Sequence, residues 1–131
     1  MSTRLFLDAV MSKPTSRPVV GSGTSVVTDE LMTLANASFP EEHQDPELMA
    51  KLAIVGYIIL GYDNVMPLFS IWREAAVLGC PVGWRNRGHL PNYRRHIWKT
   101  DADIKFTKDF LNHPAAKTLL KAISILKKIA R

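Results

Sequence analysis

The sequence has only one cysteine, Cys80, and this scarcity sets the first limits on the protein. A single thiol cannot form an internal disulfide, so the fold must be held together by its apolar core. The nearby histidines, His89 and His96, do not complete the spacing of a zinc site. We therefore expect an intracellular protein of the cytoplasm or nucleus, where thiols stay reduced, with no bound metal and no cofactor.

The N-terminal segment lacks the long apolar run of a secretory signal, because its longest run, Leu5 to Leu7, is followed by Asp8. Its basic, hydroxyl-rich composition leaves a mitochondrial transit peptide as a minor alternative. Four residues that interrupt helices are spread through the segment: Pro14, Pro18, Gly21 and Gly23. We therefore expect residues 1–27 to be a flexible leader that precedes one helical domain, residues 28–131.

Strand signals are almost absent, since the only valine pairs of note are short and lie beside glycines. Helix signals are clear by contrast. Thr28 and Asp45 are good N-cap residues, and Pro46 suits the first position of a helix. Gly61 suits a helix end. The sequence therefore predicts an all-α fold, a compact bundle of about five helices near residues 28–39, 46–60, 65–78, 101–111 and 115–130.

No residue between Leu52 and Tyr62 is charged, which predicts a helix that is buried on nearly all sides. Ile58 and Ile59 are therefore expected to lie in the core. The alternative is one membrane span over residues 52–72, but helix breakers and a charge would fall in its middle: Gly61, Asp63, Asn64 and Pro67. Two buried helices joined by a turn explain these residues without that penalty.

Basic side chains are scarce in the first half of the chain and abundant in the second. Residues 1–74 carry five basic and nine acidic side chains, a net charge of −4. Residues 75–131 carry twelve basic and three acidic side chains, a net charge of +9. Such a basic half indicates an anionic partner, and nucleic acid and a negatively charged membrane surface both fit.

Residues 80–99 contain the first candidate binding site, because five cations alternate there with three aromatic side chains and no acid intervenes. Arginine makes two-point contacts with phosphate, and flat aromatic rings stack on unpaired bases, as RNA recognition requires. The alternative is that the tryptophans anchor the loop in the core while the arginines cover their faces. The candidate residues are Arg85, Arg87, Arg94, Arg95, Lys99, Trp84, Tyr93 and Trp98.

The last predicted helix offers a second basic surface. At helical spacing, Lys117, Lys121 and Lys128 form a stripe opposite the apolar face. These lysines are placed to contact phosphates or to lie on an anionic bilayer. The alternative is a helix that completes the bundle and whose lysines are merely solvated.

Catalytic signals are few. Gly21-Ser22-Gly23 lacks the third glycine of a dinucleotide-binding loop, so it is better explained as a linker. Asp101 and Asp103 are better explained as acids that favour the start of a helix. We therefore predict that the protein is not an enzyme.

The favoured function is non-catalytic binding of nucleic acid, RNA before DNA, by a small basic protein of the viral accessory or nucleocapsid type. The alternative is a peripheral membrane or matrix-type assembly protein that binds anionic lipid or partner subunits. The expected partners are therefore nucleic acid, an anionic membrane surface or another copy of the chain.

Overall fold

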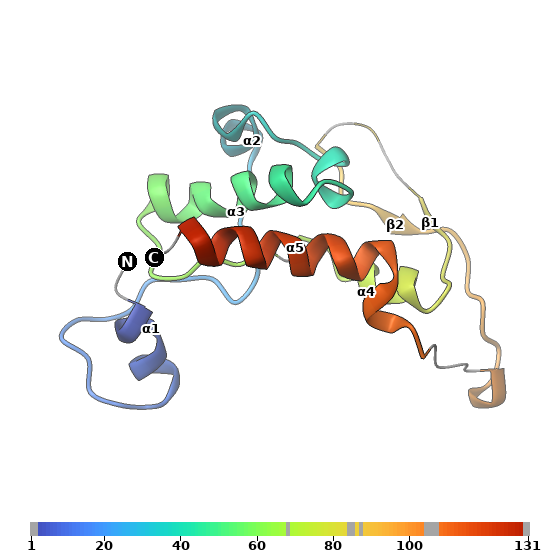
Figure 1. The fold of residues 1–131 in the computed structure, drawn as a ribbon, viewed down its shortest axis with the longest axis horizontal. Helices are drawn as coiled ribbons and strands as arrows, with labels where there is room; N and C mark the ends of the chain where they lie inside the picture. The colour runs from blue at the N-terminus through green and yellow to red at the C-terminus, as the bar shows by residue number, and fades with distance from the viewer. Residues whose placement is uncertain (1–2, 68, 84–85, 87, 104–107, 130–131) are drawn as a thin grey trace.

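Two helices form the centre of the structure, α3 (Pro46–Leu60) and α5 (Pro114–Ile129), and they pack against each other (Figure 1). The structure is a computed structural model that describes residues 3–67, 69–83, 86, 88–103 and 108–129. The other elements are helices α1 (Thr3–Val10), α2 (Asp29–Ala35) and α4 (Trp72–Val77), strands β1 (Val82–Gly83) and β2 (Asn92–Tyr93), and 3-10 helices η1 (Glu41–His43), η2 (Asp101–Asp103) and η3 (Phe110–Asn112).

Helix α3 begins and ends where the sequence predicts. The Asp45 side chain accepts hydrogen bonds from the backbone N–H groups of Glu47 (2.7 Å) and Leu48 (3.2 Å), which satisfies two donors at the helix start. Pro46 occupies the first turn, where its missing N–H costs nothing. Gly61 ends the helix in the left-handed region with φ of 71°, which glycine adopts without strain.

The apolar core collects around α3 and is closed by α5. Met49 and Leu52 are 0% and 2% exposed at the middle of α3. Ala122 and Leu126 bring the buried face of α5 into the same cluster. Burying a leucine fully is worth about 1.5–3 kcal/mol, so this helix pair supplies much of the stability. The whole cluster comprises Met32, Ala37, Phe39, Met49, Ala50, Leu52, Ala53, Phe69, Ala122 and Leu126.

The last turn of α3 does not lie in the core, and the prediction that it would is wrong. Ile58 is 65% exposed, Ile59 is 54% exposed and Leu60 is 44% exposed. The uncharged run therefore covers two environments, a buried first part and an apolar surface at its end. No helix in the described part of the chain is long and apolar enough to cross a membrane.

The prediction of a mostly helical fold is confirmed. The described residues contain five α-helices and one small sheet, in which β1 and β2 pair antiparallel with Val82 opposite Tyr93. The five helices are not the five that were predicted, because α1 was not expected and the described residues of one expected helix form only short 3-10 helices.

Two predicted helices differ in length or kind. Of the described residues in the predicted helix at 65–78, only 72–77 are helical, and in the segment before them the backbone carbonyl of Met66 accepts a hydrogen bond from the Ser25 hydroxyl (2.6 Å). The helix predicted at 101–111 forms only η2 and η3, and its residues 104–107 lie outside the described part. There the Asp103 carboxylate accepts hydrogen bonds from the backbone N–H groups of Lys99 and Thr100 (2.9 Å each).

The segment that precedes α2 runs beside the turn after α3. Asp63 accepts two hydrogen bonds from the Arg17 guanidinium (2.8 and 2.6 Å). The Asn64 side chain exchanges two hydrogen bonds with the backbone of Ser22 (3.0 and 2.7 Å). These bonds join the segment to the core helices, and the predicted domain boundary at residue 27 stays a prediction.

We expect Leu52→Ala to lower the free energy of unfolding by about 2–5 kcal/mol, because it leaves a cavity in the core. The matched change Ile58→Ala, on the exposed turn of the same helix, should cost less than about 1 kcal/mol. Urea unfolding followed by circular dichroism measures both values. Equal losses in the two variants would contradict the burial described here.

The pairing of Asp63 with Arg17 should make stability depend on pH in acid. The Arg17 hydrogen bonds, helped by the N–H of Val20, lower the pKa of Asp63 to about 2. An unfolded aspartate titrates near about 3.9, so this stabilisation is complete above that pH and is lost as the pH falls toward about 2.

The variant Asp63→Asn should therefore lose less stability than the wild type between about pH 4 and pH 2. Thermal melts at several pH values measure the difference. Asp101→Asn, which removes an exposed carboxylate elsewhere, is the control. A wild-type acid profile in Asp63→Asn would show that the pair does not form.

Candidate functional site: a buried arginine beside a cavity

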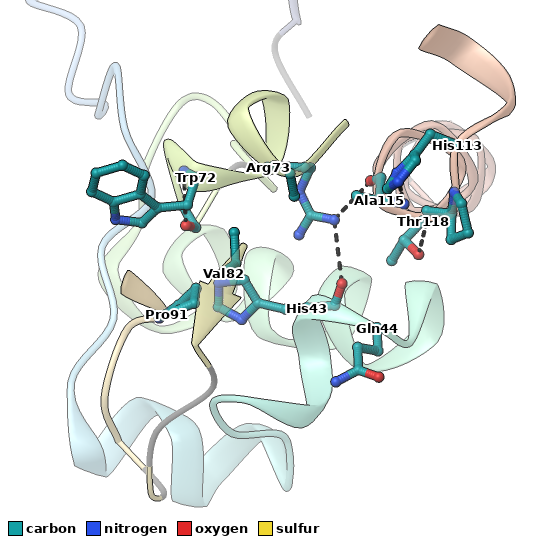
Figure 2. Close-up of a pocket in the computed structure, with 12 residues that line it drawn as sticks. His43, Gln44, Trp72, Arg73, Val82, Pro91, His113, Ala115 and Thr118 are labelled. Carbon is teal, nitrogen blue, oxygen red and sulfur yellow. Dashed lines mark hydrogen bonds between the residues drawn. The ribbon is translucent and has the colours of Figure 1, made fainter. Parts of the chain in front are cut away.

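Helix α4 places one cation in the interior of the protein. Arg73 lies in the first turn of α4 and is only 7% exposed. Its Nη1 donates hydrogen bonds to the backbone carbonyls of His43 (3.2 Å) and Ala115 (2.9 Å). These carbonyls belong to η1 and to the first turn of α5, so one nitrogen joins three elements (Figure 2).

The other two nitrogens of the same guanidinium, Nε and Nη2, donate to no acceptor among the described residues. They lie on one edge of the planar group, and this edge matches the two oxygens of a carboxylate. A buried N–H without an acceptor costs about 1–3 kcal/mol, and more when the group is charged. Arg73 therefore keeps a pair of charged donors that the described protein does not use.

Arg73 also lines a cavity of about 380 Å³, a volume at the small end of ligand-binding pockets. Figure 2 shows its guanidinium in the middle of the residues that surround this space. Trp72, Val82 and Pro91 contribute apolar wall, and Thr118 contributes a hydroxyl. None of the described residues that line the cavity is acidic, and Arg73 is the one arginine or lysine among them, so it gives the wall a positive charge.

A buried acid partly balances Arg73 without lining the cavity. Glu42 is 0% exposed and contacts the ring of His43. Burial raises the pKa of Glu42, and His43 and Arg73 act in the opposite direction. Burial likewise lowers the pKa of Arg73 while the charge of Glu42 raises it, and arginine stays protonated in proteins. The positive charge of Arg73 therefore favours the ionised form of Glu42, while burial favours its protonated form.

His113 adds a second polar group at the cavity wall. Its Nδ1 accepts a hydrogen bond from the backbone N–H of Ala115 (3.2 Å). A neutral ring in this arrangement carries its proton on Nε2, which makes that atom a donor. The described wall therefore combines a cation, a second nitrogen donor and apolar surface, which is the composition of a small-molecule site.

The predicted site in residues 80–99 is described only in part, since three members lie outside the described residues: Trp84, Arg85 and Arg87. Tyr93 is 41% exposed, and its ring packs against the rings of Trp72 and His96 at centroid distances of 5.0 and 5.2 Å. Trp98 is half-buried. Tyr93 thus belongs to an aromatic cluster, and the described cations of the segment are exposed: Arg94, Arg95 and Lys99.

The predicted lysine stripe lies on the exposed face of α5, where its spacing placed it. Ala122 and Leu126 bury the opposite face in the core. The exposed lysines are Lys117, Lys121 and Lys128. No described cation from the stripe or from residues 80–99 lines the cavity beside Arg73.

The sequence interpretation did not single out Arg73, although one signal was present. Arg73 is the only basic residue between Lys51 and Arg85, and Glu74 is the one other charged residue between Asp63 and Arg85. Charged residues are almost never fully buried unless they are paired. A cation in a mostly apolar stretch is therefore a candidate for a buried residue with a specific partner. The pairing with the carbonyl of Ala115 could not be predicted, because it depends on how α4 meets α5.

The described residues thus form a cavity with one buried cation in its wall, and comparison with known proteins shows the family to which the chain belongs. All of residues 1–131 match the profile of the uroporphyrinogen decarboxylase (URO-D) family. The chain is 33% identical over 119 residues to the methylcobamide:CoM methyltransferase MtbA of Methanosarcina mazei. It is 30% identical over 128 residues to the methylcobamide:CoM methyltransferase MtaA of Methanosarcina barkeri.

A solved structure agrees with these matches. A methyltransferase from Methanosarcina mazei superimposes with a TM-score of 0.92 at 26% identity, covering 98% of this chain and 39% of the other. The MtbA match covers 90% of this chain and 35% of the relative, and the MtaA match covers 97% and 38%. The chain thus spans little more than a third of the curated relatives it matches.

The chain belongs to the uroporphyrinogen decarboxylase family. The prediction that it is not an enzyme is therefore wrong, because the matched relatives are methyltransferases. The predictions of a nucleic-acid-binding or nucleocapsid-type protein, and of a matrix-type alternative, are wrong for the same reason. The expected partners (nucleic acid, an anionic membrane or another copy) are wrong as well, because the names of the matched relatives specify methylcobamide and CoM.

Proposed function

We propose that the chain forms part of an enzyme that transfers a methyl group from a methylated cobamide to the thiol of coenzyme M. One observation carries this proposal: the chain aligns over 90% of its length with a methylcobamide:CoM methyltransferase at 33% identity. In this transfer the methyl group leaves the cobamide and joins the sulfur, and the thiol gives up its proton.

The described residues supply a cavity wall for such an enzyme. No group of three or more His, Cys, Asp or Glu side chains in the described part is placed to hold a metal ion. A cavity of about 380 Å³ suits a small substrate and is too small to enclose a cobamide ring system. Residues beyond those matched in this chain must therefore complete the reaction site.

The exposed end of α3 is suited to contact that remainder. Ile58, Ile59 and Leu60 form three consecutive apolar residues, each more than 40% exposed. Contiguous exposed apolar surface typically marks a contact region. Because the chain covers 39% of the superimposed methyltransferase, we propose that this turn packs against the portion of the family fold that the chain does not cover.

A chimaera tests the proposed function. The matching residues of the Methanosarcina mazei MtbA would be replaced by this chain, and methyl transfer from methylcobamide to coenzyme M would be measured. We expect the chimaera to transfer methyl groups, because the backbone superimposes closely on a methyltransferase of that organism. A chimaera that melts like the native enzyme but transfers nothing would overturn the proposal.

The variant Ile58→Glu tests the proposed contact within the same experiment. In the isolated chain this change should leave the melting temperature nearly unchanged, since Ile58 is largely exposed there. In the chimaera it should lower the melting temperature, because it places a charge in an apolar contact. Equal melting behaviour of Ile58→Glu in both contexts would contradict a contact at this turn.

A further inference from the structure

We propose that the cavity beside Arg73 binds the carboxylate of a small organic acid. The carboxylate oxygens would accept hydrogen bonds from Nε and Nη2 of Arg73, the two nitrogens that donate to no described acceptor. This inference depends on the geometry of the cavity alone. It holds whether or not the chain takes part in methyl transfer.

The orientation of Arg73 favours a carboxylate. Nη1 is fixed by the carbonyls of His43 and Ala115, so the guanidinium plane is held before any ligand arrives. Two parallel N–H groups on one edge then match the two oxygens of a planar carboxylate. A preoriented donor pair binds more tightly than a flexible one, because less side-chain freedom is lost on binding.

The charge and shape of the wall agree with this ligand. None of the described lining residues is acidic, so an anion meets no repulsion from the wall itself. His113 is a second nitrogen donor at the wall, and Trp72, Val82 and Pro91 offer apolar contact. The ligand that fits is therefore a short organic acid with one carboxylate and an apolar body.

Glu42 is the internal competitor for the same guanidinium edge. It is buried and interacts electrostatically with Arg73, yet it makes no hydrogen bond to Nε or Nη2. If Glu42 occupied this edge in solution, an added carboxylate would not reach it. The experiment must therefore observe Arg73 directly.

Nuclear magnetic resonance of the ¹⁵N-labelled full chain provides that observation. The Nε–H resonance of Arg73, assigned through its backbone connectivity, would be followed while propionate is added at constant ionic strength. We expect the resonance to shift and to saturate in the millimolar range, as suits a ligand of so few atoms. Propionamide, which has the same shape without the charge, should leave the resonance in place.

A matched pair of variants on α4 shows whether the cavity is the binding place. Ala76 lines the cavity, and Ala76→Leu should fill it and weaken propionate binding by about tenfold or more. Ala75 is the adjacent residue and does not line the cavity, so Ala75→Leu is the control and should bind propionate like the wild type.

The two variants can be compared only if both retain the wild-type circular dichroism spectrum. If they do not fold, the propionate titration of the wild-type protein still tests the proposal. The proposal is overturned if the Arg73 resonance of the folded chain ignores propionate, or if it responds equally to propionamide. It is also overturned if Ala76→Leu, when folded, binds propionate as tightly as the wild type. Loss of methyl transfer in the chimaera has no bearing on any of these readouts.

Discussion

The structure depends on one buried cation. Arg73 bonds through Nη1 to backbone carbonyls of η1 and of α5, and it carries the positive charge that balances the buried Glu42. Burying a charge is costly unless it is paired and hydrogen-bonded, so the carbonyls of η1 and α5 that accept from Nη1 hold these elements beside α4. The same constraint fixes the guanidinium plane and leaves one donor edge beside the cavity. One side chain, Arg73, therefore contributes both to the packing of these elements and to the donors beside the cavity.

The apolar side chains of α3 lie in two environments, and the family fold offers an explanation for the exposed ones. The middle of α3 is buried against α5, whereas the turn at Ile58 exposes apolar side chains. In a self-contained helical bundle such a turn would be a liability, but the family fold extends well beyond the part that this chain matches. The positive charge of the second half suggested a nucleic-acid partner, and its described cations lie on solvated faces such as that of α5.

The sequence predicted correctly those features that depend only on neighbouring residues. Asp45, Pro46 and Gly61 fixed the ends of α3 because capping needs only neighbouring residues. The exposure of Ile58 could not be predicted, because a one-dimensional run of apolar residues does not say which part meets a partner element. After Thr100 the described residues form only the short 3-10 helices η2 and η3, although the Asp103 carboxylate accepts from the N–H of Thr100 as an acid does at a helix start. The Arg73 site was missed because its parts come from segments some thirty to forty residues apart in the sequence. The net charge did not predict the family, because it describes the protein surface and not the relationship to known enzymes.

The free energy of unfolding of Arg73→Met tests the central role of the buried cation most directly. Methionine fills a similar volume but leaves the Glu42 charge and two carbonyls without their partner, so the account predicts a loss of about 3 kcal/mol or more. Arg94→Met, the same change at an exposed arginine, should stay within about 0.5 kcal/mol of the wild type. If Arg73→Met unfolds at the same urea concentration as Arg94→Met, the fold does not depend on Arg73 and the account is contradicted.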